Sequence, residues 1–411
     1  MTNLPQGWEW KSLGEICFIT DGTHKTPNYI ETGIPFLSVK NISKGFFDLS
    51  DVKYISLEEH NKLIKRAKPE FGDILICRIG TLGKAIKISL EFEFSIFVSL
   101  GLLKPKVKII SDYLVYFLNS YFIEEWINDN KVGGGTHTAK LNLNILEKCP
   151  IALPPLKEQE RIVGILDESF AKIDESIKIL EQDLLNLDEL MQSALQKAFN
   201  PLKDNVKENY KLPQSWEWKS LGEIANTSSG GTPSRNKKEY WENGNIKWLK
   251  SGELNDGYID FIEENITEEA IKNSSAKIFQ KGTLLIAMYG ATAGKLGILN
   301  LDSTTNQAIC AFLHKDKNIK FLEKFLFYFL FFLRDKIIKD SFGGAQPNIN
   351  QTYIKNLQIP LPPIKEQEQI ASHLDELSSH VKNLKQNYQA QIKDLQELKN
   401  SLLDKAFKGN L

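Results

Sequence analysis

A long heptad-patterned segment occurs twice in this chain, and it constrains the fold more than any other feature. After the proline pair Pro154-Pro155, apolar residues recur at steps of three and four from Ile162 to Ala198. This spacing is typical of a coiled-coil seam. A helix over residues 157–199 would be roughly 60 Å long. An apolar stripe that is so long and narrow needs a second helix of the same length as its partner.

An internal repeat supplies that partner. Residues 151–168 and 359–376 are identical at twelve of eighteen positions, and a second stripe runs from Ile370 to Leu402. The alternative is two independent surface helices, but the matched starts and ends favour one intramolecular pair. Because each helix leaves a different globular region, a pair that packs side by side has to be antiparallel. The interface is expected to contain Ile162, Leu166, Ile173, Leu180, Leu187, Ile370, Leu374, Val381, Tyr388 and Leu395.

The repeat extends to the globular regions. Residues 4–16 and 212–224 are identical at twelve of thirteen positions, again at an offset of 208, while the middles of the two modules have diverged. The predicted division is a first domain at 1–155, a spacer helix at 156–200, a second domain at 201–363 with a polar linker at 200–211, and a second spacer helix at 364–411.

Each globular region is expected to mix strands and helices. Short β-rich runs such as 73–77 and 284–288 are bounded by glycine turns and followed by one helix and a Gly-rich loop. The predicted fold class is α+β: two pseudo-symmetric mixed α/β domains separated by a long antiparallel two-helix coiled coil.

Composition limits the function. The net charge of −1 over 411 residues creates no global basic field, so DNA binding has to use local patches or a basic partner. The four cysteines are scattered singly, which favours reduced thiols over a zinc site or disulfides. The apolar run at 325–333 is too short to cross a bilayer and is expected to be a core helix. We expect a cytoplasmic protein without a membrane partner.

The most specific motifs resemble a known family. Pro-Pro-x-x-Glu-Gln before a long helix occurs twice, and Trp-Glu-Trp-Lys-Ser-Leu-Gly-Glu-Ile opens both domains. Together with the tandem architecture, these motifs resemble the specificity subunit of type I restriction–modification systems. The loop at 228–235 with Trp241 and Trp248 also fits the pattern, as does Asn306-Gln307-Ala308. The first domain departs from this pattern: residues 22–29 replace that loop, and Phe94-Ser95-Ile96 stands where Asn-Gln-Ala is expected.

The resemblance implies a non-catalytic subunit that reads DNA. Each domain would be a target recognition domain for one half of a bipartite asymmetric sequence in double-stranded DNA. The helices would set the spacing and dock two methyltransferase subunits, and restriction/translocase subunits would complete the complex. No cofactor is expected in this chain, because S-adenosylmethionine, ATP and Mg would be bound by the partners.

Twelve residues are candidates for DNA contact, although a turn, cap or solvated role is an alternative for each. Lysines after glycine turns can meet phosphates, and Asn, Gln, Arg and Lys side chains can read base edges. The candidates are Lys25, Lys84, Thr136, His137, Lys140, Arg235, Lys237, Lys238, Lys295, Gln346, Asn348 and Asn350. No catalytic residue and no metal site are predicted.

Two other classes of protein remain as alternatives. The chain could be a coiled-coil scaffold with two protein- or glycan-binding domains. It could also be a phosphotransferase that uses residues 290–295, but this segment has three residues between its glycines where a phosphate loop has four. Leu296 also replaces the Ser or Thr that would hold magnesium.

Overall fold

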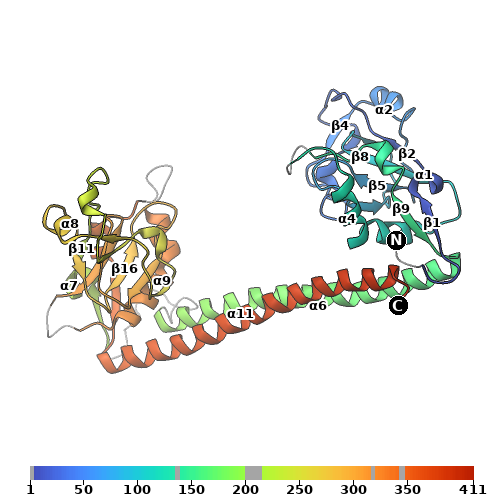
Figure 1. Cartoon of the computed structure of the whole chain (residues 1–411). Coiled ribbons are helices and arrows are strands. Elements are labelled where there is room, and N and C mark those ends of the chain that lie inside the picture. Colours follow the sequence, from blue (N-terminus) through green and yellow to red (C-terminus); the bar gives the residue numbers. More distant parts are fainter. Residues whose placement is uncertain (1–3, 135–138, 200–214, 316–319, 342–347) are drawn as a thin grey trace. The chain divides into compact units, whose positions relative to one another are not determined.

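The chain forms two compact units. The computed structural model describes residues 4–134, 139–199, 215–315, 320–341 and 348–411. The first unit contains Met1–Glu181 and Gln389–Leu411, and the second contains Gln182–Tyr388. Both long helices, α6 (Leu156–Phe199) and α11 (Ile364–Phe407), pass through both units (Figure 1). We call residues 4–155 head one and residues 215–363 head two. Since the units divide the helices near their middles, the predicted domain limits stay a prediction.

Head one is a mixed α/β structure. Its strands are β1 (Glu9–Ser12), β2 (Cys17–Asp21), β3 (Ile34–Leu37), β4 (Lys53–Ile55), β5 (Ile74–Cys77), β6 (Ala85–Lys87), β7 (Ser95–Ile96), β8 (Leu100–Pro105) and β9 (Pro150–Leu153). Its helices are α1 (Leu13–Ile16), α2 (Leu57–Leu63), α3 (Ser111–Leu118), α4 (Tyr121–Asn130) and α5 (Leu143–Leu146). The sheets have the strand orders β2-β8-β5-β6 and β4-β3-β7, and β1 pairs with β9.

Head two is built in the same way. Its strands are β10 (Glu217–Ser220), β11 (Ala225–Ser229), β12 (Ile246–Leu249), β13 (Gly257–Ile259), β14 (Asn265–Ile266), β15 (Ile278–Phe279), β16 (Leu284–Ala287), β17 (Leu296–Leu299), β18 (Ser303–Thr305), β19 (Ile309–His314) and β20 (Gln358–Leu361). Its helices are α7 (Leu221–Ile224), α8 (Glu268–Lys272), α9 (Glu323–Asp340) and α10 (Gln351–Asn356). The sheets have the orders β11-β19-β16-β17-β13 and β14-β12-β18-β15, and β10 pairs with β20.

The two heads share one topology. The order β2-β8-β5-β6 matches β11-β19-β16-β17, the order β4-β3-β7 matches β14-β12-β18, and the terminal pairs β1-β9 and β10-β20 correspond. Head two adds β13 to one sheet and β15 to the other. The predicted α+β class and the duplicated module are therefore confirmed.

One alignment made from the sequence is wrong. We placed Phe94-Ser95-Ile96 opposite Asn306-Gln307-Ala308. The backbone N–H of Phe97 donates to the carbonyl oxygen of Leu37, however, and that of Asn306 donates to the equivalent carbonyl oxygen of Leu249. The tripeptide that corresponds to Asn306-Gln307-Ala308 is thus Phe97-Val98-Ser99. The loop between β6 and β7 is longer than the loop between β17 and β18, and this length difference shifted the alignment.

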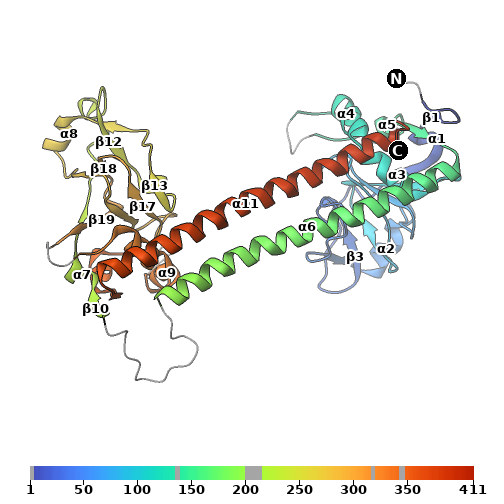
Figure 2. The same ribbon diagram turned by 90° about the horizontal axis from the view of Figure 1, so that it is seen from below.

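The long helices run antiparallel within each unit. In the second unit Lys385 of α11 forms an ion pair with Asp188 of α6, and in the first unit Lys399 pairs with Asp174. Within the second unit, the end of α6 from Leu190 to Ala198 lies beside the start of α11 from Gln369 to Leu377, beyond the Asp188–Lys385 pair. Within the first unit, Ile162 and Leu166 near the start of α6 share a core with Leu403 and Ala406 near the end of α11, beyond the Asp174–Lys399 pair. Figure 2 shows the two helices side by side in each unit. The expected antiparallel pairing is confirmed.

The predicted interface residues are all at least half-buried. Ile162, Leu166, Ile173, Leu187, Leu374 and Val381 are buried, and Leu180, Ile370, Tyr388 and Leu395 are half-buried. The stripe is not uniform, however, because Leu384 and Leu398 are exposed while Leu195 and Leu403, outside it, are buried. Near its ends each helix packs against a head as well as against the other helix, so the buried face is wider there than a coiled-coil seam.

The repeated Pro-Pro-x-x-Glu-Gln motif has a structural explanation in its glutamine. The Gln159 side chain is 1% exposed, donates to the carbonyl oxygen of Pro154 at 2.8 Å and accepts from the N–H of Ile110 at 2.9 Å. Gln367 makes the same two bonds in the second unit, to Pro362 and from Leu322. Each glutamine therefore joins the start of a long helix to its own head.

The apolar run at 325–333 lies in α9, where Phe325 to Leu330 are buried in the core of the second unit, as expected. Among the described residues, no helix combines the length and apolarity that a membrane span requires.

Candidate functional site

Two of the candidate DNA-contact residues of head one lie on segments that meet at Arg78, just after β5. Lys140 pairs with Ile79 through an isolated β-bridge, and the N–H of Leu141 donates to the carbonyl oxygen of Arg78. Lys25 lies in the loop that follows β2, and Asp21 is the last residue of that strand. Both lysines are exposed. The fold therefore gathers segments that are far apart in the sequence at one end of a sheet.

A buried carboxylate lies at the centre of this region. Asp21 is 1% exposed and forms ion pairs with Arg66 through Oδ1 and with Arg78 through Oδ2. His24 Nε2 also lies 3.0 Å from Oδ2. Burial raises the pKa of the Asp21 carboxyl, but hydrogen bonds from Arg66 and Arg78 and their charges outweigh that effect, so the pKa lies below its usual value. Asp21 is therefore ionised at neutral pH.

Head two has neutral side chains in the same place. Ser229, at the end of β11, accepts a 2.6 Å hydrogen bond from the Gln351 side chain, whose oxygen accepts from Thr227 at 2.8 Å. Asn348 pairs with Tyr289 through an isolated β-bridge, as Lys140 pairs with Ile79, and is exposed. The side chain of Asn350 accepts from the N–H of Tyr353 at 2.8 Å and caps α10. Both predicted residues are exposed, but the side chain of Asn350 is engaged in the helix cap.

The basic cluster at 235–238 is held by its own head. The Arg235 guanidinium stacks on Trp241 at 3.6 Å and lies 4.9 Å from Trp248. It also pairs with Glu264 at 2.7 Å. Lys237 Nζ donates to the Tyr240 hydroxyl at 2.9 Å, and Lys238 lies 3.8 Å from Glu242. The two aromatic rings and Glu264 fix the geometry of Arg235.

The two lysines that follow glycine turns lie in unlike surroundings. Lys84 lines a cavity of about 560 Å³ in the first unit, together with Lys44, Lys87 and Lys399. Lys295 is exposed. In its turn the N–H groups of Ala293, Gly294 and Lys295 donate to carbonyl oxygens of the same hairpin. These three donors are used within the turn, so they are not available to cradle a phosphate.

Thr136, His137 and Gln346 lie outside the described residues. Within the described ranges, no cluster of three or more His, Cys, Asp or Glu side chains could hold a metal ion.

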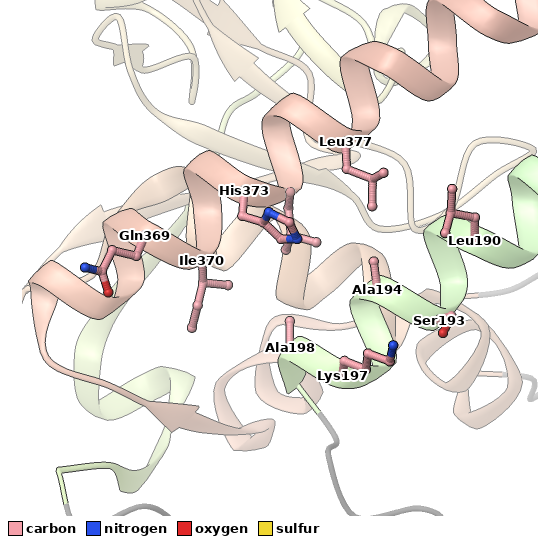
Figure 3. A pocket seen from close by; sticks show the side chains of 10 residues that line it. Leu190, Ser193, Ala194, Lys197, Ala198, Gln369, Ile370, His373 and Leu377 are labelled. Carbon is pink, nitrogen blue, oxygen red and sulfur yellow. The ribbon is translucent and has the colours of Figure 1, made fainter.

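An open groove lies between the long helices in the second unit (Figure 3). It has a volume of about 530 Å³. Its lining consists mainly of apolar and small side chains: Leu190, Ser193, Ala194, Lys197, Ala198, Gln369, Ile370, His373, Leu374 and Leu377. Leu190 is 48% exposed, and Leu398, 208 positions later in the repeat, is 45% exposed. The repeat thus exposes a leucine at the same place on each long helix.

Sequence reasoning missed Asp21, Arg78 and this groove. The charge pair could have been suspected from the alignment, since Arg78 of head one is replaced by Met288 in head two. The groove carries no comparable sequence signal, because it arises where Ala194 and Ala198 leave space between helices.

Comparison with known proteins agrees with this architecture. A family model described as "Type I restriction modification DNA specificity domain" matches twice, at residues 5–184 and 213–394. A relative, the type I restriction enzyme StySPI specificity subunit of Salmonella potsdam, is 27% identical over 99% of this chain and 90% of its own length. The EcoKI specificity subunit of Escherichia coli K12 is 26% identical over the same shares.

Solved structures show the same fold. A chain from a study of complex assembly and conformational transition of the type I R-M system aligns over all of both chains with a TM-score of 0.80 and 23% identity. The HsdS subunit of Thermoanaerobacter tengcongensis aligns over 100% of this chain and 99% of its own with a TM-score of 0.61 and 23% identity. With the family model matched once per module, the chain belongs to the non-catalytic specificity subunits of type I restriction–modification systems.

Proposed function

We propose that this chain reads a bipartite DNA target, with head one recognising one half and head two the other. The observation that carries the proposal is that the two heads share a topology but differ in the chemistry at the end of the same sheet. Head one has Lys140 and the Asp21–Arg78 pair there, whereas head two has Asn348 and the neutral Ser229–Gln351 bond. Lysine favours guanine edges and phosphates, and asparagine favours adenine edges, so unlike heads suit an asymmetric target.

The proposed partners follow from the family. The chain would work with double-stranded DNA, two methyltransferase subunits and restriction/translocase subunits. S-adenosylmethionine, ATP and Mg would be held by those partners. The two long helices would set the gap between the half-sites and dock the methyltransferase subunits.

Mapping methylated adenines in cells with and without this chain tests the reading function. The expected result is a motif made of two specified blocks separated by a constant unspecified gap. Inserting seven residues into each long helix should lengthen that gap by roughly 3 base pairs, since seven residues add about 10 Å of helix and a base pair rises about 3.4 Å. A motif with one block, or a gap that ignores the insertion, would contradict the proposal.

The docking function makes a prediction about stoichiometry. Leu190 and Leu398 occupy equivalent positions of the repeat, so they offer the same contact to two copies of one partner. Leu190→Glu is expected to remove one methyltransferase copy from the purified complex, Leu398→Glu the other, and the double variant both, because a carboxylate is not tolerated in an apolar contact. Light scattering of the purified complexes measures the change in mass.

Leu185→Glu is the matched control. Leu185 is 58% exposed on α6, but the repeat places Lys393 at its counterpart, so it is not a duplicated contact. This variant should keep two methyltransferase copies. If the double variant also kept two copies, docking would have to use another surface.

A further inference from the structure

At one end of the β2-β8-β5-β6 sheet, head one has three neighbouring residues that are all replaced by other residue types in head two. Asp21, Arg78 and Gly101 correspond to Ser229, Met288 and Cys310, as the strand pairing shows. Gly101 is part of the set because a Cβ at this position would lie 2.9 Å from Cγ2 of Ile76 and 3.1 Å from Cδ of Arg78. The glycine thus leaves room for the arginine side chain. The carboxylate of Asp21, the guanidinium of Arg78 and the glycine that leaves room for it therefore occur together in head one, and head two has none of the three.

Arg78 joins segments that are distant in the sequence. Its guanidinium pairs with Asp21, which precedes the loop of Lys25, and its Nε donates to the carbonyl oxygen of Leu141 at 2.9 Å, next to Lys140. It also donates to the carbonyl oxygen of Val98 at 3.3 Å. Each of these bonds ends on backbone or on a buried carboxylate, so the arginine fixes where the neighbouring loops run.

Arg78 is poorly placed to contact DNA itself. Its side chain is 10% exposed and that of Asp21 is 1% exposed. An ion pair so well shielded from solvent is screened little by salt. Any effect of the pair on DNA reading has to act through the exposed residues on the loops that it holds.

We propose that Asp21 and Arg78 are positioning residues that fix the reading loops of head one, a task that the neutral Ser229–Gln351–Thr227 hydrogen bonds perform in head two. This inference rests on the proposed function, because it assumes that head one reads one half of the target. Equivalent loops are thus held by an ion pair in head one and by neutral hydrogen bonds in head two. Loss of the pair should therefore affect one half-site only.

Single and double variants separate positioning from stability. Asp21→Ser leaves the buried Arg78 guanidinium without its carboxylate, and Arg78→Met leaves the buried Asp21 carboxylate with Arg66 as its remaining arginine partner. Each variant is expected to lower both the melting temperature of the first unit and the selectivity at one half-site. We expect selectivity, measured as methylation of the target relative to single-base variants of one half, to fall about tenfold or more. Selectivity at the other half should be unchanged.

The double variant Asp21→Ser/Arg78→Met carries the residues of head two and has no buried charge at either position. It is expected to regain the melting temperature while selectivity stays low, because the side-chain bonds from Arg78 to Asp21, Val98 and Leu141 are then absent. The hydrogen bonds of head two cannot replace them, since head one has Leu143 where head two has Gln351. If the double variant regained both, or if the single variants kept full selectivity, the inference would be overturned. If the ion pair contributed only to stability, the double variant would regain the melting temperature and the selectivity together.

Gln351→Leu is the matched variant in head two. It removes the hydrogen bonds to Ser229 and Thr227 and is expected to lower selectivity at the opposite half-site only. Loss at the same half-site as Arg78→Met would overturn the assignment of one network to each head. If the unaltered complex read no two-part target, the proposed function itself would be wrong. If it read such a target but the variants behaved otherwise than expected, only the positioning role would be wrong.

Discussion

Replacing Phe199 with alanine is expected to destabilise the second unit by about 3–5 kcal/mol. Phe199 is the last residue of α6 and is 5% exposed. Its ring centroid lies 5.3, 5.5 and 6.0 Å from those of Phe325, Phe329 and Phe332 on α9. Truncation removes these contacts and leaves a cavity, which the closely packed rings of α9 can fill only in part.

Hydrogen exchange followed by mass spectrometry measures this loss separately for each unit. Amides of β16 and α9 should exchange faster in Phe199→Ala, whereas those of head one should keep their rates. The repeat offers a matched variant, because the Phe407 ring lies 4.9 Å from Phe117 and 5.6 Å from Tyr113 in the first unit. Phe407→Ala should accelerate exchange in head one and leave head two unchanged.

Leu185→Ala is the control for both, since this side chain is 58% exposed and its loss should change stability by less than about 0.5 kcal/mol. Unchanged protection in Phe199→Ala would show that the end of α6 contributes little to the core of the second unit.

A methyl group at Gly230 is expected to destabilise head two by about 3 kcal/mol. A Cβ at this position would lie well under 3.0 Å from the carbonyl oxygen of Thr305. Because the obstacle is backbone of β18, no side-chain rotation relieves the overlap, and β11 and β18 have to separate. Gly22 has the same relation to the carbonyl oxygen of Ile96 in head one, so Gly22→Ala should have the same effect there.

Thermal unfolding measures this effect. For a unit of about 200 residues, 3 kcal/mol corresponds to a fall in melting temperature of about 6–12 °C. Gly252→Ala provides the control, since a Cβ there meets nothing within 4 Å. A melting temperature of Gly230→Ala equal to that of Gly252→Ala would mean that the two strands separate freely.

Much of the architecture was predictable because it depends on period and repetition. Apolar residues at steps of three and four define a helix face wherever the chain lies, and a repeat at an offset of 208 predicts one fold used twice. The role of Gln159 was not predictable in this way. Its motif was visible in the sequence, but its partner Ile110 is separated from it along the chain by α3, α4, α5 and β9. Local pattern carries no information about such a contact.

The candidate site was predictable only in part. Lys140 and Asn348 were predicted as candidates in two corresponding Gly-rich loops. The structure places them in equivalent β-bridges, Lys140 with Ile79 after β5 and Asn348 with Tyr289 after β16. Arg235 was predicted as a candidate for DNA contact, with a solvated role as the alternative, and the structure shows that two tryptophans and Glu264 hold it in place. A charge in the sequence does not reveal whether its partner is DNA or the protein itself.

By itself the sequence determined the duplication, the class of fold, the two long helices and their antiparallel pairing, since each follows from spacing along the chain. Only the tertiary structure decided that Asp21 and Arg78 meet, that Gly101 leaves space for that arginine, and that a groove opens beside Leu190. Each of these features joins residues from different strands or helices. The burial and packing that stabilise such contacts exist only in the folded chain, so no local sequence pattern reveals them.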